Sequence, residues 1–101
     1  IDITDWVAEY VAESQIANGL AVVYSKHTIA AVRINENEPL LLDDMARFLE
    51  KIFLRDHSYQ HNNFEIRTVN MNENESPKGR ASLQNLLMGT SETVQVMDGQ
   101  M

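Results

Sequence analysis

The sequence predicts an α+β fold, a sandwich in which helices pack on a mixed, mostly antiparallel sheet. Apolar residues recur at helical spacing in three segments, at 4–17, 41–54 and 79–88. Between these segments lie short runs that are continuously apolar or that alternate apolar and polar residues, as strands do. Helices interspersed with strands of this kind are typical of the α+β class.

Length and charge bound the function. A chain of 101 residues predicts a single domain over 1–101 with a modest core. Its formal net charge of −7 predicts no nucleic-acid and no membrane partner, because both surfaces would repel it. The absence of cysteine excludes disulfides and thiolate chemistry and fits a cytoplasmic location.

The first elements are a helix and a strand. Residues 4–17 form the first helix, with Thr4 or Asp2 as the cap of its first turn and the following Asn-Gly pair as its stop. Leu20–Tyr24 is continuously apolar and predicts a strand that is covered on both faces.

A second strand is expected at Ile29–Ile34, where side chains alternate, and it is expected to neighbour the first strand in one sheet. His27 and Thr28 then lie at the bend between the two strands. Asn35 and Glu36 follow the second strand directly.

The second helix, over 41–54, has a clear apolar stripe and begins with Asp43 and Asp44 in its first turn. We expect this stripe to pack against the sheet that contains Val22 and Val32. The centre of the stripe is formed by Phe48, Leu49 and Ile52.

The remaining elements are shorter. Residues 64–70 alternate as a strand, 72–79 have loop composition, and 79–88 form a short helix with its leucines toward the core. The last strand is Thr93–Met97. The Asp-Gly pair that follows is a strong hairpin signal, so the returning strand is expected to begin at Gln100 and the chain to be incomplete at both ends.

Two groups of polar residues are candidates for a site. Lys26, His27 and Thr28 offer an ammonium, an imidazole and a hydroxyl at a strand end, suited to phosphate, to a metal or to proton transfer; the alternative is a loop histidine that caps strand backbone. At the other end of the apolar run, Glu36 and Asp44 are hard oxygen ligands that suit Mg²⁺ or another divalent metal held on a substrate's phosphates.

Further along the chain, Arg80 and its neighbours at the start of the third helix are a candidate anion site, although solvated basic residues are common in such loops. His61 is either a ligand or a solvated side chain. The two separated histidines have no recognised metal-binding spacing.

Taken together, these residues carry a resemblance to a known family. The stretch "GLAVVYSKHTIAAVRINENEPLLLDDMARFLEKI", the later "SYQHN" and "NENESPKGRASLQNLLMGTSE", and the final Asp-Gly turn resemble the signature of the YjbQ family, also called UPF0047. The resemblance covers nearly the whole chain. It implies an α+β sandwich, a homotrimer and, for some members, a weak thiamine-phosphate synthase activity.

The resemblance also implies a polar cluster, whose members are His27, Thr28, Asn35, Glu36, Asp44 and His61. The chain departs from the family pattern in two places. Ile29 stands where a threonine is usual, and "KGRAS" over 78–82 replaces a segment that usually carries two histidines, so that Ser82 occupies a histidine position.

Three functions follow as expectations. The first is a transferase that joins a pyrimidine pyrophosphate to a thiazole phosphate and releases pyrophosphate, with His27, Thr28, Glu36 and His61 as catalytic residues. Lys26, Asn35 and Arg80 would then bind phosphate, and Glu36 and Asp44 would hold the metal. The second is a noncatalytic protein that binds a small phosphorylated or anionic metabolite. The third is a structural oligomer without a ligand.

Overall fold

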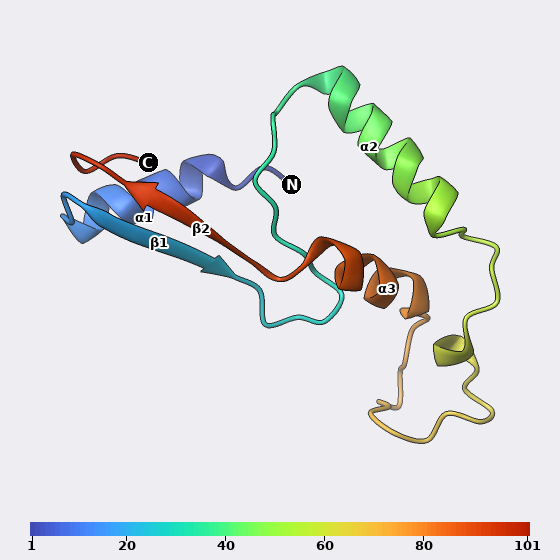
Figure 1. Ribbon diagram of the computed structural model, residues 1–101. Coiled ribbons are helices and arrows are strands. Elements are labelled where there is room, and N and C mark those ends of the chain that lie inside the picture. The colour runs from blue at the N-terminus through green and yellow to red at the C-terminus, as the bar shows by residue number, and fades with distance from the viewer.

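The computed structural model describes residues 1–101 and confirms the α+β class. In chain order the elements are α1 (Thr4–Ser14), β1 (Gly19–Tyr24), α2 (Pro39–Ile52), the short 3₁₀ helix η1 (Gln60–Asn62), α3 (Gly79–Met88) and β2 (Ser91–Val96). The molecule is elongated, with extents of 54 × 33 × 18 Å, and α1, β1 and β2 form one end of it (Figure 1). None of the three α-helices has the length and hydropathy that crossing a bilayer demands.

The sheet consists of β1 and β2, paired antiparallel with Gly19 opposite Val96 and Tyr24 opposite Ser91. The first strand therefore pairs with the last element of the chain. Ile29–Ile34, which the alternation pattern predicted as its neighbour, forms no strand, and that prediction is wrong.

The hairpin turn after β2 is confirmed. Met97 and Gln100 exchange two backbone hydrogen bonds, of 2.8 and 2.9 Å, around Asp98 and Gly99. Both central residues have positive φ, of 51° and 76°, as a two-residue hairpin turn requires. The Gly99 N–H also donates to the Ala17 carbonyl at 2.8 Å, which attaches this turn to the connection between α1 and β1.

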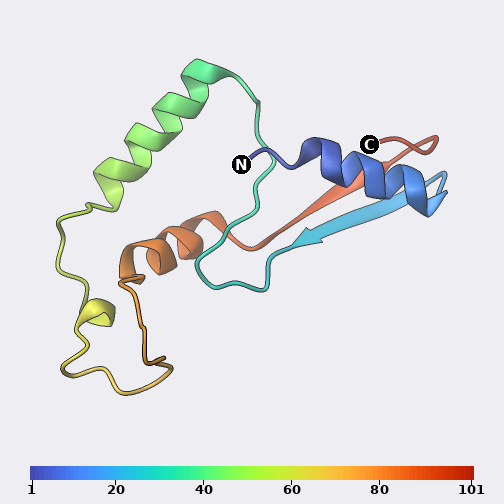
Figure 2. The ribbon, with the colours of Figure 1, turned by 180° about the vertical axis from the view of Figure 1, so that it is seen from behind.

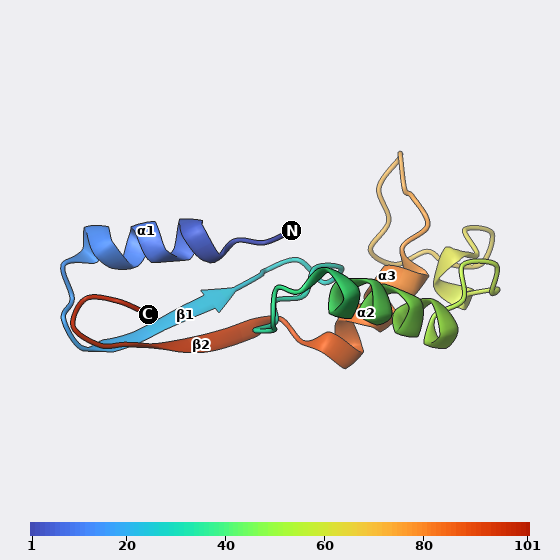
Figure 3. The ribbon, with the colours of Figure 1, turned by 90° about the horizontal axis from the view of Figure 1, so that it is seen from above.

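One face of the sheet is covered by α1, and the other face is open, as Figures 2 and 3 show from two sides. Val11 of α1 and Val96 of β2 are the buried apolar side chains. On the open face, Leu20, Val22 and Tyr24 remain 71%, 68% and 62% exposed. The prediction that β1 is covered on both faces is therefore wrong within this chain.

An apolar groove of about 510 Å³ also runs between α1 and β1.

The segment 64–70, predicted as a strand, forms turns instead. A strand needs a neighbour to take up its backbone hydrogen-bonding groups, and none lies beside this segment or beside 29–34. Alternation in the sequence therefore indicated which residues could form strands, but strand formation depends on a partner.

The second helix begins at Pro39, where Glu38 acts as the N-cap. The Glu38 carboxylate accepts hydrogen bonds from the Leu40 N–H at 2.9 Å and the Leu41 N–H at 2.7 Å. The helix starts two residues earlier than predicted, so Asp43 and Asp44 lie beyond its first turn.

The prediction that α2 packs on the sheet is also wrong. The extended segment 25–38 leads away from the sheet, and α2 stands apart from both strands (Figure 1). Phe48 and Ile52 are 59% and 47% exposed. The anchoring contact of α2 is instead made at its C-terminal end, with α3.

Candidate functional site

The loop after β1 presents three polar side chains to solvent. The Ser25 N–H donates to the Thr90 carbonyl at 2.9 Å, and the Ser25 hydroxyl accepts from the His27 N–H at 3.2 Å, which turns the backbone away from the sheet. Lys26, His27 and Thr28 are exposed on this turn. None of their side chains makes a hydrogen bond or an ion pair within the chain, so His27 does not cap the strand.

Lys26 is unusual among the basic residues. Only Lys26 and Lys51 have no carboxylate within ion-pair distance. The others are all paired: Arg33, Arg47, Arg55, Arg67, Lys78 and Arg80. In a chain with a net charge of −7, Lys26 therefore carries a positive charge that no carboxylate within ion-pair distance offsets, and it is followed directly by an exposed imidazole.

The other end of the apolar run has mostly structural roles. Asn35 contacts the Met45 sulfur, and the Asn37 amide donates to the Asp2 carboxylate at 2.9 Å. Glu38 caps α2, so Glu36 is the one residue of the polar run 35–38 whose side chain is left without a contact. The Asp2 carboxylate accepts a hydrogen bond from the Thr4 N–H at 2.9 Å, and hydrogen bonds from Thr4 are the chief cause of its lowered pKa. The N-cap position of α1 is held by Ile3, so the prediction that Thr4 or Asp2 is the cap is wrong.

Glu36 and Asp44 are both exposed, and neither belongs to a formed metal site. No group of three or more His, Asp or Glu side chains lies together in the structure. The chain therefore offers no complete protein cage for a cation, and Mg²⁺ on either carboxylate would need oxygens from a ligand and from water to complete its shell.

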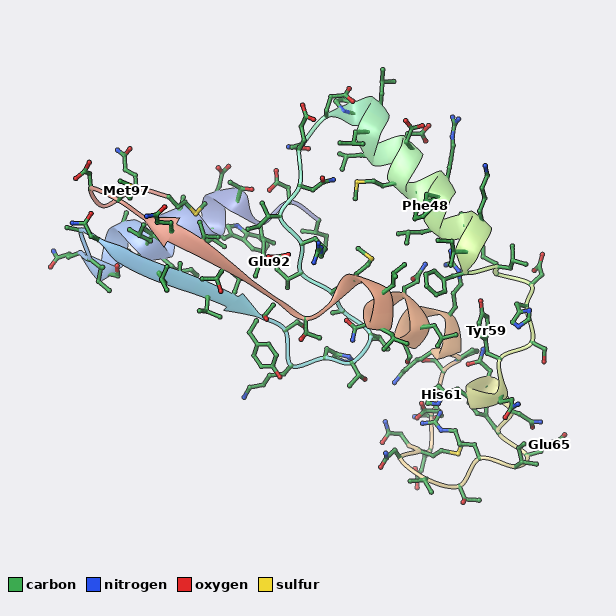
Figure 4. The ribbon with its side chains drawn as sticks, viewed as in Figure 1. Phe48, Tyr59, His61, Glu65, Glu92 and Met97 are labelled. Carbon is green, nitrogen blue, oxygen red and sulfur yellow. The ribbon has the colours of Figure 1, made fainter.

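The corner between η1 and α3 holds His61. The Asn62 side-chain oxygen accepts a hydrogen bond from the Gly79 N–H at 2.8 Å, and Gly79 is buried against Tyr59. His61 itself is exposed, and Figure 4 shows it and Glu65 on opposite sides of η1.

Arg80 links α3 to the end of α2. Its Nε donates to the Phe53 carbonyl at 2.7 Å and its Nη2 to Glu50 at 3.1 Å. Glu50 also accepts from Arg55 at 2.7 Å, and this hydrogen bond, more than the charge of Arg80, lowers the pKa of Glu50. Arg80 thus satisfies a carbonyl left open at the helix end, which leaves fewer of its donors for a phosphate.

Sequence reasoning missed a second network, centred on Arg67 and Glu75. Their side chains are 12% and 5% exposed and form an ion pair at 3.3 Å. The Glu75 carboxylate also accepts the Asn72 N–H at 3.0 Å and lies 3.7 Å from the Lys78 ammonium. A signal was present in the sequence, because an arginine within an otherwise alternating run precedes a polar loop that carries a glutamate.

The predicted site residues are not gathered in one place. The segment that follows His27 and Thr28 attaches to the C-terminal end of α3, where the Val32 N–H donates to the Gly89 carbonyl at 3.2 Å. His61 lies at the N-terminal end of α3. A helix of 10 residues is about 15 Å long, so the two histidines lie at opposite ends of it.

This α+β arrangement is that of a known family. A family model described as "UPF0047 protein YjbQ-like" matches residues 1–101, and the chain belongs to the YjbQ/UPF0047 family. It is 39% identical over 101 residues to a UPF0047 protein of Methanothermobacter thermautotrophicus, a match that covers the whole chain and 63% of that protein. It is 36% identical over 101 residues to a UPF0047 protein of Archaeoglobus fulgidus, with 69% of that protein covered.

Solved structures share the fold. A hypothetical protein of Aeropyrum pernix K1 superposes with a TM-score of 0.81 at 31% identity, over 100% of this chain and 67% of that one. A YjbQ/UPF0047 family protein of Clostridium acetobutylicum gives 0.80 at 31% identity, over 99% and 68%. A Sulfolobus solfataricus protein described as of unknown function gives 0.80 at 26% identity, over 99% and 64%. The chain thus spans about two thirds of the length of its relatives.

Proposed function

We propose that the protein binds a small phosphorylated or otherwise anionic metabolite at the turn formed by Lys26, His27 and Thr28. The carrying observation is that all three side chains are exposed and unpaired, although most basic residues of the chain are neutralised by carboxylates. An ammonium, an imidazole and a hydroxyl can all donate to phosphate oxygens.

The remaining candidates extend this proposal. His61 of η1 and His27 lie near opposite ends of α3, too far apart to share a small ligand within one chain. We therefore place His61 opposite the turn of a neighbouring subunit in a homotrimer. Glu36, Asn35 and Asp44 would orient the ligand, or Mg²⁺ carried by it, from the side of α2. A cytoplasmic location, where phosphorylated metabolites occur, belongs to the same proposal.

Thiamine-phosphate synthesis is the second candidate function. Both of its substrates carry phosphate groups, so the free Lys26–Thr28 turn would serve this reaction as well. Turnover separates the two candidates, because a binding protein is expected to be stabilised by phosphate compounds without forming product. Release of pyrophosphate when the pyrimidine pyrophosphate is joined to the thiazole phosphate would support the synthase function, provided that His27→Ala abolishes this release.

The binding site is tested by calorimetry on the full-length protein with inorganic pyrophosphate, with and without Mg²⁺. Lys26→Met and His27→Ala are each expected to weaken binding about tenfold, as loss of a hydrogen bond to a charged group does. Their melting temperatures should stay near that of the wild type, because both side chains are exposed and form no hydrogen bond or ion pair within the chain.

Lys51→Met is the matched control, since Lys51 is the other lysine without a carboxylate partner and lies on α2. It is expected to bind pyrophosphate with unchanged affinity. If Lys26→Met and Lys51→Met bound equally well, the turn would not be the site.

The trimer is tested by sedimentation. The full-length protein is expected to sediment as three copies of the chain at micromolar concentration. A monomer under these conditions would eliminate a site shared between subunits and would leave His61 without a ligand to contact.

A further inference from the structure

The segment between η1 and α3 is closed by a part-buried ion pair, Arg67–Glu75, which the alternation pattern did not predict and which does not belong to the proposed site. Arg67 lies at the centre of this segment. Its guanidinium faces the Glu75 carboxylate and three backbone carbonyls, and its side chain is 12% exposed. An arginine enclosed in this way fixes the positions of everything that it contacts, since its donors form a rigid planar fork.

The carbonyls that Arg67 contacts show what the fork holds. Nε donates to the Val69 carbonyl at 3.3 Å, and Nη2 donates to the carbonyl of Asn70, a residue with a positive φ of 54°. Nη1 divides its hydrogen bonds between Glu75 and the carbonyl of His61, at 3.3 and 3.4 Å. The backbone of His61 is therefore joined directly to the ion pair.

His61 is held from its other side as well. Its neighbour Asn62 accepts the Gly79 N–H at 2.8 Å, which attaches η1 to the first residue of α3. The exposed imidazole thus lies on a short helix whose backbone is held by Arg67 at His61 and whose next side chain, that of Asn62, is held by Gly79. Functional side chains are characteristically supported by a second layer of hydrogen bonds of this kind.

We propose that Arg67 is a positioning residue for His61: together with Glu75, it fixes the backbone that presents the imidazole to the anionic ligand. This inference rests on the proposed function, in which His61 contacts that ligand. Arg67 does not touch the ligand itself, because its donors face the protein.

The test is a double-mutant cycle on the full-length protein, with inorganic pyrophosphate as the probe and calorimetry as the readout. Arg67→Lys keeps the charge and loses the fork, and it is expected to weaken binding about tenfold, as loss of the group behind a ligand residue does. His61→Ala should weaken binding by a similar factor. If Arg67 acts through His61, Arg67→Lys will have no further effect in the His61→Ala background.

Two further measurements separate positioning from stability. Val96→Ala removes part of a buried side chain in the sheet and should lower the melting temperature without changing the affinity. The imidazole resonances of His61 should shift on addition of pyrophosphate in the wild type and not in Arg67→Lys.

The outcomes are distinguishable. Absence of pyrophosphate binding by the wild type would overturn the proposed function and this inference together. Binding by the wild type, with equal effects of Arg67→Lys in the presence and absence of His61, would overturn the inference alone. A loss of affinity in Val96→Ala as large as that in Arg67→Lys would show that destabilisation alone is enough to weaken binding, and would also overturn it.

Discussion

Replacing Gly79 by alanine is expected to destabilise the protein by about 1–3 kcal/mol, the usual cost of overpacking a close contact. A Cβ atom at this position would lie 2.6 Å from the Cβ of Tyr59 and 3.0 Å from the side-chain oxygen of Asn62. The Asn62 oxygen can move away at the end of its side chain, but the contact with Tyr59 cannot be relieved in this way, because the Tyr59 Cβ is attached directly to the backbone. The change would also stretch the hydrogen bond from the Gly79 N–H to Asn62.

Urea denaturation of the full-length protein measures this effect, and Gly19→Ala is its control. At Gly19 the nearest atom to a new Cβ is the Cγ2 methyl of Ile16, at 3.2 Å, which is a looser contact than the 2.6 Å to the Tyr59 Cβ. Gly19→Ala should therefore cost clearly less than Gly79→Ala. A Gly79→Ala protein within a few tenths of a kcal/mol of the wild type would contradict the packing of η1 on α3.

Acidification is expected to open the segment between η1 and α3 through Glu75. The Asn72 backbone N–H holds the pKa of Glu75 below its ordinary value of 4.5, with the charges of Lys78 and Arg67 acting in the same direction against the opposing effect of burial. Because the pKa is lowered in the folded state, the ionised carboxylate favours folding. That contribution is complete above pH 4.5 and is lost as the pH falls through the pKa of the folded state.

Melting temperatures of the wild type and Glu75→Gln, measured from pH 7 downward, test this linkage. The wild type should be clearly more stable at pH 7, because the glutamine leaves Arg67 without its counter-charge. The difference should shrink below pH 4.5, where the unfolded chain takes up a proton. Glu65→Gln, in the same segment but exposed and without an ion pair, should match the wild type throughout. A Glu75→Gln difference that did not change with pH would refute the role of this carboxylate.

The helices were predictable from the sequence, because each carries its own periodic pattern and local stop signals. All three formed, and 79–88 was correct at both ends. The first helix ends at Ser14, three residues early, since Gln15 adopts a left-handed φ of 58° that no residue type there signals. Strands were less predictable. The segments 29–34 and 64–70 have the pattern of strands and find no partner, whereas β1 pairs with β2 near the other end of the chain, with Gly19 opposite Val96.

The candidate site was predictable in its chemistry and not in its geometry. Residue types identified Lys26, His27 and Thr28, and the structure leaves these three free. Their distance from His61 depends on which end of α3 the loop after β1 contacts and which end η1 contacts. No local sequence pattern predicts these two long-range contacts. Arg67 escaped prediction for a related reason. Alternation of apolar and polar residues predicts on which side of a strand the Arg67 side chain lies. It does not predict that the guanidinium folds back to donate to the carbonyls of His61 and Asn70.

The hydrogen bond between Asn62 and Gly79 has a consequence for how this part of the chain can vary. It brings the two ends of a long excursion to one point, so a change in the length of the excursion need not displace either end. The extended run 25–38 has no such closure, because it bridges the distance from β1 to α2 and its length decides where α2 begins. Natural length variation should therefore concentrate in the first segment and be rare in the second.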